Sequence, residues 1–328
     1  MLPNMKDVAK KSGVSIATVS HVINKTRFVS NEVIAKVNDA MCELDYHPNT
    51  IARSLRTKVT NTVSLIIPDI SNYFFTSVAE GIESTLRASG YNLFLCNSNE
   101  NFDNEIGLIN LSKSQMIRGL IIAPTSAQFD YRSIVSKNFP MVFIDRKPID
   151  NQGDSVLVEN EKSVYEAIEI LIKRGHKRIG FISGLPGLTT TDERIQGYKK
   201  ALSNYSIDFD AQLIKSGDSK AESGFNMAKE LINTTDITAL LVSNNMMTIG
   251  AIKYTSQSNI KIPDQIAVIG YDDYEWVNIT NPPLTVVKQP AYEIGQKSAE
   301  FLIEKIENPK SIYKEYRFPA EIVMRKSC

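Results

Sequence analysis

The chain has 328 residues and a mass of 36.7 kDa, enough for two or three domains, and its 42% hydrophobic and 23% charged residues are typical of a soluble globular protein. No apolar run approaches the roughly 18 residues of a membrane helix, and the polar N-terminus lacks the hydrophobic region of a secretory signal, so we expect a cytoplasmic protein with no membrane partner. Three cysteines and three histidines, all widely separated, predict neither a disulfide framework nor a metal site.

The formal net charge of zero hides an uneven distribution along the chain. Residues 1–60 hold nine Lys and Arg against five Asp and Glu, a formal charge of +4, which leaves −4 for the rest. A small basic segment on a larger, mildly acidic body favours a module that binds a polyanion such as nucleic acid, although a basic surface can also be merely solvated.

Two short helices are predicted at the N-terminus. The first covers residues 5–11 and ends at Gly13, because glycine readily takes the positive φ that terminates helices. Ser15 can cap a second helix over residues 16–24, because its hydroxyl can accept from the free amides of the first turn. The turn between them is only about three residues long, as in a helix-turn-helix.

A third helix is predicted over residues 31–44, with Ser30 as its cap. Its apolar residues repeat at steps of three and four, which places them on one face. These residues are Val33, Val37, Met41 and Leu44. Three amphipathic helices in fewer than fifty residues predict one compact all-α domain.

The second helix has an apolar face and a face of small and polar side chains. Val19, Val22 and Ile23 share the apolar face, whereas Ala17, Ser20 and His21 point away from it. With free hydroxyls expected at Ser15, Thr18 and Ser20, such a helix can enter the DNA major groove without steric collision, its N-terminal amides facing phosphate. The alternative is a three-helix adaptor with a polar outer face.

Five stretches of this region are specific enough to show a family resemblance. They resemble the DNA-binding head of the LacI/GalR family of bacterial repressors, and HVINKTRFV at 21–29 is most similar to the purine and ribose repressors; taken as a whole, the chain is most like ribose operon repressors. The stretches are KDVA at 6–9, GVS at 13–15, TVSHVIN at 18–24, YHPN at 46–49 and IARSL at 51–55.

The resemblance implies a role for each exposed position of the second helix. Ile16, Ala17 and His21 are expected to contact base edges. Ile16 and Ala17 cannot hydrogen-bond a base, so their readout has to be apolar, for example against a thymine methyl group. The expected phosphate contacts come from Ser15, Thr18, Ser20 and Asn24.

Residues 49–61 follow this domain, which we place at residues 1–48, and form a short basic hinge or linker. The segment is too short for a stable isolated helix. The resemblance implies a hinge helix that folds only on operator DNA, with Leu55 wedged into the minor groove and Arg53 and Arg56 on phosphates. Without the resemblance, Leu55 is a linker residue that packs on the body.

From residue 62 onward, apolar runs alternate with helical patterns. Runs without polar alternation are typical of strands buried on both faces, as in parallel α/β sheets. A helix between them carries the stripe Val164, Ala167, Ile168, Leu171 and Ile172. The predicted strands are VSLII at 63–67, NLFLC at 92–96, GLIIA at 119–123, MVFID at 141–145, RIGFI at 178–182, TALLVS at 238–243, IAVIGYD at 266–272 and LTVV at 284–287.

The two sets of strands predict two doubly wound parallel-sheet lobes in tandem. This agrees with the periplasmic-binding-protein-like core that the resemblance implies, in which the chain crosses between lobes near residues 160, 290 and 320. We expect an N-terminal lobe of residues 62–160 with 290–320, and a C-terminal lobe of residues 161–289 with 321–328.

Polar and aromatic side chains follow the predicted strands. Ligands of such sheets bind beyond the carboxyl ends of the strands, so these residues are candidates for one cleft. Singly, each also has an ordinary structural role as a core residue, an ion pair, a helix cap or a turn residue. Together they offer two carboxylates, two guanidiniums, three carboxamides and two rings: Asp145, Asp272, Arg146, Arg194, Asn72, Asn244, Gln289, Phe74 and Phe75.

That combination suits a sugar, because bidentate polar groups bind vicinal hydroxyls and rings cover the apolar face. The same positions resemble the ligand set of ribose-binding proteins, which implies ribose or a similar monosaccharide as effector. Bound sugar would then bridge Asp145 and Arg146 on one side and Arg194 and Asp272 on the other.

Three positions qualify this comparison. Asn245 stands where the family usually has aspartate; asparagine can still cap a helix, so we expect little loss, although sugar selectivity can shift. Leu188 stands where the purine repressor has an arginine for its base, which argues against a purine corepressor. Arg194 is kept, whereas catabolite control proteins usually have lysine there. The sequence lacks the leucine heptads of a tetramerising tail, so a homodimer is expected rather than a tetramer.

An enzymatic role is not expected, and neither is a cofactor. The phosphate-binding patterns G-x-G-x-x-G and G-x-x-x-x-G-K-[ST] are absent, and no histidine belongs to a recognisable nucleophile motif. The sequence therefore predicts a repressor of a sugar-utilisation operon that binds a pseudo-palindromic operator as a homodimer. The alternative is a catabolite control regulator activated by a phosphocarrier protein.

Overall fold

The computed structural model describes residues 3–24, 27–46 and 60–328. The chain forms two compact units, residues 1–59 and residues 60–328. Among the described residues, no helix is long and apolar enough to cross a membrane, and no group of three or more His, Cys, Asp or Glu side chains could hold a metal ion.

The N-terminal unit contains the three predicted helices, α1 (Met5–Ser12), α2 (Ile16–Asn24) and α3 (Asn31–Glu43). Gly13 ends α1 with a φ of 70°, the left-handed conformation that glycine adopts without a steric penalty. The core is formed by fully buried Val8, Val19 and Val37, one from each helix. The all-α head is therefore confirmed.

The two predicted helix caps differ. The Ser15 hydroxyl accepts a hydrogen bond from the backbone N–H of Thr18 at 3.0 Å, as expected for a cap of α2. Ser30 stands at the N-cap position of α3, but its side chain makes no capping hydrogen bond. Its backbone carbonyl accepts from Ile34 instead, so the prediction of a side-chain cap is wrong at this helix.

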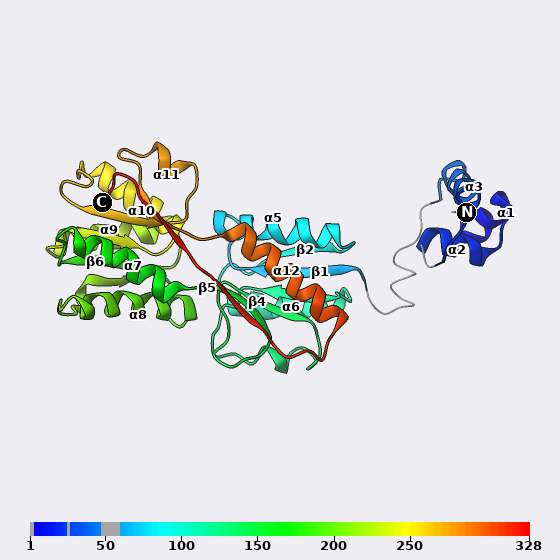
Figure 1. Cartoon of the computed structure of the whole chain (residues 1–328), viewed down its shortest axis with the longest axis horizontal. Helices are drawn as coiled ribbons and strands as arrows, with labels where there is room; N and C mark the ends of the chain where they lie inside the picture. The colour runs from blue at the N-terminus through cyan, green and yellow to red at the C-terminus, as the bar shows by residue number, and fades with distance from the viewer. Residues whose placement is uncertain (1–2, 25–26, 47–59) are drawn as a thin grey trace. The chain divides into compact units, whose positions relative to one another are not determined.

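The C-terminal unit consists of two α/β lobes, each built on a six-stranded sheet (Figure 1). The first sheet is parallel throughout, in the order β11-β5-β4-β3-β1-β2. Its strands are β1 (Thr62–Ile67), β2 (Asn92–Asn97), β3 (Gly119–Ile122), β4 (Met141–Ile144), β5 (Asp154–Val158) and β11 (Glu315–Phe318), and its helical segments are α5 (Tyr73–Ala88), α6 (Phe102–Ser114), the 3₁₀ turn η1 (Tyr131–Ser133) and α12 (Ala291–Glu307).

The second sheet has the order β12-β10-β9-β8-β6-β7 and is parallel except for β12, which runs antiparallel to β10. Its strands are β6 (Ile179–Ser183), β7 (Ile214–Ser216), β8 (Ala239–Val242), β9 (Ala267–Tyr271), β10 (Thr285–Lys288) and β12 (Glu321–Val323). Its helical segments are α7 (Asn160–Lys173), α8 (Thr189–Asn204), the 3₁₀ turn η2 (Ala211–Leu213), α9 (Ala221–Thr234), α10 (Asn245–Gln257) and α11 (Trp276–Ile279).

All eight predicted strands are present, and the two-lobed α/β architecture is confirmed. The prediction of burial on both faces is wrong for β2, which lies at a sheet edge and leaves Leu95 37% exposed. The chain passes from one sheet to the other three times, between β5 and α7, between β10 and α12, and between β11 and β12 (Figure 1).

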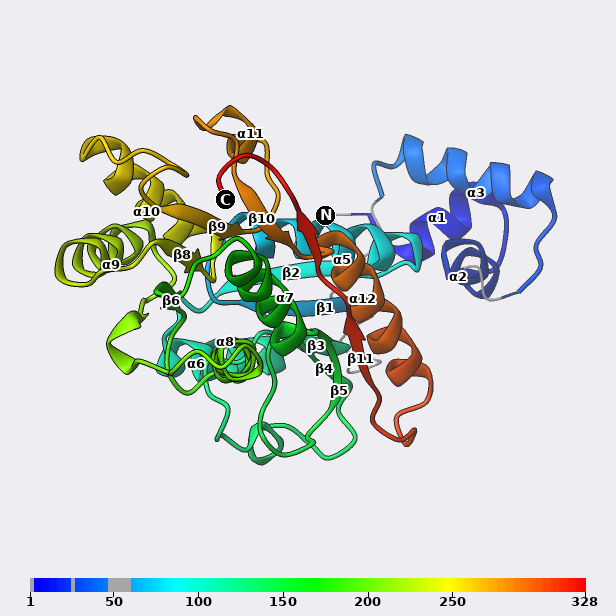
Figure 2. The ribbon, with the colours of Figure 1, turned by 60° about the vertical axis from the view of Figure 1, so that its left-hand side comes forward.

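Helices α5 and α12 lie side by side on the first sheet although about 200 residues separate them (Figure 2). Glycine permits this close approach, because a Cβ at Gly81 would lie 2.1 Å from the carbonyl oxygen of Tyr292, and one at Gly295 would lie 2.1 Å from that of Val78. The two backbones therefore touch directly.

Candidate functional site

The exposed face of α2 carries the residues predicted to contact DNA. Val19 is buried in the head, and Val22 and Ile23 pack against the same core. On the opposite side, Ile16 is 45% exposed and Ala17 is exposed. The face also includes exposed Ser15 and half-buried Thr18, Ser20, His21 and Asn24.

The hydroxyls of this face are not free, contrary to the prediction. Ser15 and Thr18 hydrogen-bond each other through their hydroxyls at 2.9 Å, and the side-chain amide of Asn24 donates to Ser20 at its carbonyl and hydroxyl oxygens. Residues one turn apart on a helix meet in this way, and each hydroxyl, with one donor and two acceptor positions, can still bond a further partner. The predicted contacts of Arg53, Leu55 and Arg56 lie outside the described residues.

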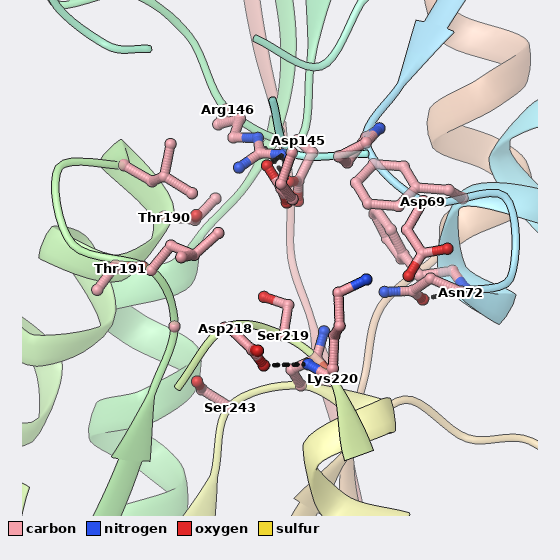
Figure 3. A pocket seen from close by; sticks show the side chains of 18 of the residues that line it. Asp69, Asn72, Asp145, Arg146, Thr190, Thr191, Asp218, Ser219, Lys220 and Ser243 are labelled. Atoms are coloured by element: carbon pink, nitrogen blue, oxygen red, sulfur yellow. Dashed lines mark hydrogen bonds and ion pairs between the residues drawn. The ribbon is translucent and has the colours of Figure 1, made fainter. Parts of the chain in front are cut away.

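In the second unit, a cavity lies between the two lobes (Figure 3). The structure brings all nine predicted effector residues to its wall: Asn72, Phe74, Phe75, Asp145, Arg146, Arg194, Asn244, Asp272 and Gln289. They meet there because the carboxyl ends of the strands in both sheets face this cavity.

Asp145 and Asp272 occupy matching positions in the two lobes. Each directly follows a central strand and has a left-handed backbone, with φ of 63° and 66°. A non-glycine residue rarely adopts this conformation, but a backbone hydrogen bond to the next strand holds each one in place, from Asp145 to Val156 and from Asp272 to Val287. The two carboxylates thus enter the cavity from opposite sheets.

Burial raises the pKa of both carboxyls, because a buried charge loses its hydration. For Asp145, the neighbouring guanidiniums of Arg146 and Arg194 oppose this rise. For Asp272, hydrogen bonds from Gln289 at 2.8 Å and Asn245 at 2.7 Å oppose it. The cavity therefore holds two partly desolvated hydrogen-bond acceptors.

Arg146 is only 3% exposed and is paired chiefly with Glu100. One guanidinium nitrogen contacts both Glu100 carboxylate oxygens at 2.9 Å, whereas the closest approach to the Asp145 carboxylate is 3.9 Å. Among the residues that the structure describes, none makes a hydrogen bond with the Arg146 Nε. A buried guanidinium N–H of this kind is available to a ligand oxygen.

Arg194 is held on three sides. Its Nε donates to Asn160 at 2.9 Å, one terminal nitrogen donates to the carbonyl of Ser243 at 2.7 Å, and its guanidinium lies 4.5 Å from the ring centre of Tyr271. The other terminal nitrogen reaches Gln289 at 3.4 Å. These contacts fix the plane of the guanidinium before any ligand arrives.

Some of the predicted residues also have the ordinary structural roles considered above. Phe74 and Phe75 belong to the core of the first lobe while contacting the cavity, with ring centres 5.1 Å apart. Asn244 caps α10, its side chain accepting from the backbone of Met247. The suggestion that Asn245 caps this helix is wrong, because Asn245 is its first residue and points elsewhere.

Sequence reasoning missed further residues of the wall. Glu100 follows β2, and Asp218, Ser219 and Lys220 follow β7, a strand that was not predicted. Glu100 lies three residues beyond the end of β2, a predicted strand, and the same inspection of strand ends would find the other three once β7 is recognised. Leu188, named above at the position where the purine repressor has an arginine, also lines the wall, and the remaining missed members are Pro68, Asp69, Gly184, Leu185, Thr190, Thr191 and Ser243.

Comparison with known proteins agrees with this two-part organisation. Residues 4–49 match the model of bacterial regulatory proteins of the lacI family, and residues 60–322 match that of periplasmic binding proteins and the sugar binding domain of the LacI family. The chain is 34% identical to the HTH-type transcriptional repressor PurR of Vibrio atlanticus, over 99% of this chain and 98% of that one.

Solved structures show the same fold over the whole chain and over its second unit. A lac repressor dimer bound to operator and the anti-inducer ONPF is 27% identical with a TM-score of 0.87, covering 100% of this chain and 99% of that one. A LacI family transcriptional regulator from Enterococcus faecium with bound ribose is 27% identical with a TM-score of 0.73, covering 81% and 98%. The chain therefore belongs to the LacI family of bacterial regulatory proteins, as a DNA-binding transcriptional repressor and not an enzyme.

Proposed function

We propose that this repressor controls a sugar-utilisation operon, binds a pseudo-palindromic operator as a homodimer, and responds to a small neutral sugar, with ribose as the first candidate. The observation that carries the proposal is the convergence of all nine expected effector residues on one cavity between the lobes. The lac repressor that has the same fold is a dimer bound to operator and an anti-inducer, and the ribose-bound regulator from Enterococcus faecium shares the fold of the second unit.

The charges on the cavity wall favour a neutral ligand over a phosphorylated one. Arg146 is already engaged with Glu100, so it offers little uncompensated positive charge. A dianionic phosphate would then face an excess of carboxylates, whereas sugar hydroxyls can donate to them. The wall holds five acidic side chains, Asp69, Glu100, Asp145, Asp218 and Asp272, against three basic ones, Arg146, Arg194 and Lys220.

The apolar part of the wall is small and fits one face of a sugar ring. Phe74 and Phe75 provide aromatic surface in the first lobe, and Leu188 lies in the second, only 7% exposed. A leucine cannot donate a hydrogen bond to a purine base. The relationship to PurR therefore supports the repressor role more than a purine effector.

Binding of the sugar would bridge the lobes through Asp145 and Arg146 on one side and Arg194 and Asp272 on the other. A ligand shifts a protein between two arrangements only if it binds one of them more tightly. Because the groups come from both sheets, bridging favours the arrangement in which the lobes approach each other. We propose that this change alters the spacing of the paired hinge segments and releases the operator.

Calorimetric titration of the full chain tests the effector. The panel consists of ribose, other pentoses, hexoses, their phosphates and purine bases, with the fluorescence of Trp276 as an independent signal. Saturable binding of ribose, together with its release of the protein from operator DNA, would support the proposal. Binding of a purine base alone, or DNA binding that requires a phosphocarrier protein and ignores every sugar, would contradict it.

A further inference from the structure

Asn245 lies behind the cavity and contacts it only through two other residues. It is the first residue of α10 and has no exposed surface. Its side-chain nitrogen lies 2.8 Å from Oδ1 of Asn72 and 2.7 Å from Oδ2 of Asp272. One amide group thus joins two residues of the proposed sugar site.

Both partners of Asn245 are obligate acceptors. Oδ1 of Asn72 already accepts from the backbone N–H of Phe74 at 3.0 Å, which fixes the orientation of the Asn72 amide. Asp272 presents a carboxylate, which accepts from Gln289 through its other oxygen. Residue 245 must therefore supply two N–H donors, which an asparagine does and an ionised aspartate cannot.

The three residues come from different lobes. Asn72 is the N-cap of α5 in the first lobe, whereas Asn245 and Asp272 belong to the second. Beside them, the rings of Tyr73 and Tyr274 make another contact between the lobes, with centres 5.3 Å apart. The hydrogen bond from Asn245 to Asn72 is thus an interlobe link made entirely by the protein.

We propose that Asn245 is a positioning residue: it ties the lobes together without ligand and orients Asn72 and Asp272 for the sugar. The inference rests on the proposed function for the role of those two residues. With its oxygen occupied, Asn72 directs its NH₂ group into the cavity (Figure 3). Asn72 then offers an N–H donor from the first lobe and Asp272 a carboxylate acceptor from the second, and each of them can hydrogen-bond a hydroxyl of the ligand.

Asn245→Asp is an informative substitution, because it keeps the size of the side chain and replaces its N–H donors with a carboxylate oxygen. In this chain an ionised aspartate at position 245 would face Asp272 at hydrogen-bond distance, and like charges so close cannot both remain ionised without cost. Because the side chain keeps its size, Asn245→Asp is expected to fold and to lose the hydrogen bond to Asn72.

The first test compares Asn245→Asp and Asn245→Ala with the wild type for ribose binding between about pH 5 and pH 8. Asn245→Asp should weaken binding roughly tenfold at the upper pH and regain most of it at the lower pH, because a shared proton restores the bond to Asp272. Asn245→Ala should weaken binding by a constant ratio. Arg194 lowers and Asp145 raises the pKa of Asp272. Both residues are present in every variant, so their effects cancel when the Kd of each variant is divided by that of the wild type.

Asn233→Asp serves as the matched control. Asn233 is exposed on α9 in the same lobe and only accepts a hydrogen bond, from the hydroxyl of Tyr254, so the substitution adds the charge and keeps the bond. Its ratio to wild type should stay near one at every pH. If Asn245→Asp follows this control, Asn245 positions nothing and the inference is wrong.

A second measurement needs no ligand and separates the inference from the choice of sugar. The thermal unfolding midpoint of ligand-free Asn245→Asp should fall relative to wild type as the pH rises, because the folded pair holds a proton that the unfolded chain releases. If the wild type binds no ribose, the proposed effector is wrong, yet this shift still tests the contact between residue 245 and Asp272, on which the positioning role depends. A midpoint difference that does not change with pH would overturn the inference.

Discussion

The guanidinium of Arg317, on β11 of the first lobe, lies 2.9 Å from the carboxylate of Glu193, on α8 of the second. Glu193 also accepts a hydrogen bond from Asn160 at 3.0 Å, and Asn160 accepts one from Arg194 at 2.9 Å. A continuous set of polar contacts therefore runs from the edge of the first sheet, through the crossing between β5 and α7, to Arg194, which is predicted to bind the sugar.

Removal of the Arg317 guanidinium should weaken sugar binding from outside the cavity. Arg317→Ala leaves Glu193 free to turn away from Asn160, so Arg194 loses part of its orientation, and we expect a roughly threefold to tenfold higher Kd in calorimetry. Glu315→Gln is the matched control, because Glu315 pairs with Arg317 on the same strand and does not reach the second lobe. An equal rise in Kd for both substitutions would show that loss of the Arg317–Glu193 contact does not affect the orientation of Arg194.

Arg194→Ala should abolish the response to sugar and leave operator binding intact. The substitution removes a cavity donor and leaves the oxygens of Asn160 and Ser243 without a partner, which costs about 1–3 kcal/mol of folding stability for each buried group left unpaired. Gel-shift titration with operator DNA, with and without ribose, measures both properties. Arg178→Ala, which removes exposed ion pairs of the same lobe, is the control. Loss of DNA binding in the Arg194 variant alone would refute its assignment to the effector site.

A negative charge on the exposed face of α2 should prevent operator binding. Ala17 is exposed at the start of this helix, where an added carboxylate would approach the DNA bases and phosphates. Ala17→Glu should lower operator affinity by at least roughly tenfold at moderate salt, while ribose binding by the other unit stays unchanged. Ala35→Glu adds the same charge at an exposed position on a different helix, α3. Equal losses for the two variants would show that the added charge matters and α2 does not.

Burial of Asp145 predicts a pH dependence of stability with a definite sign. Its pKa is raised by burial in the folded protein, so the folded state keeps a proton that the unfolded state releases as the pH rises above about 4. The wild type therefore loses stability through this residue between the ordinary carboxyl pKa and the raised one. The stability of Asp145→Asn relative to wild type should rise over the same range, as measured by urea unfolding at several pH values.

Asp210 provides the opposite case in the same experiment. Its pKa is lowered, first by a hydrogen bond from the backbone of Gln212 and also by Arg178, so its stabilising contribution is lost as the pH falls. Asp210→Asn should therefore lose stability relative to wild type as the pH rises. If the stability relative to wild type changed with pH in the same direction for both variants, the environments assigned to Asp145 and Asp210 would be wrong.

The sequence predicts the strands well where they are apolar, and most of these are internal to a sheet. Of the four strands it missed, β7, β11 and β12 lie at sheet edges, and β11 reads EYRF with half its residues exposed. The fourth, β5, is internal and buried, but it begins with the polar residues Asp154 and Ser155. Pairing with a neighbouring strand, rather than hydrophobicity, makes such segments extended. The missed cavity residues after β7 follow from the same limitation, whereas Glu100 was missed although β2, the strand before it, was predicted.

Local sequence also could not separate two adjacent asparagines. Asn244 and Asn245 are equally suited to cap α10, and which one does so depends on where the helix begins relative to β8. The structure gives the cap to Asn244 and turns Asn245 toward the other lobe. Likewise, the pattern of α2 predicts an exposed face but not the hydrogen bonds that its hydroxyls make with one another.

The glycine contact between α5 and α12 has a mechanical consequence. Where two backbones touch without intervening side chains, no side-chain rearrangement can accommodate sliding of one helix along the other. We therefore expect α5 and α12 to move together as one rigid body. Both helices begin beside the cavity, α5 at Asn72 and α12 directly after the crossing that follows β10. A displacement of that crossing would therefore rotate the first lobe as a whole, together with its side of the cavity wall. Bending between the lobes would then be confined to the three segments that cross from one sheet to the other.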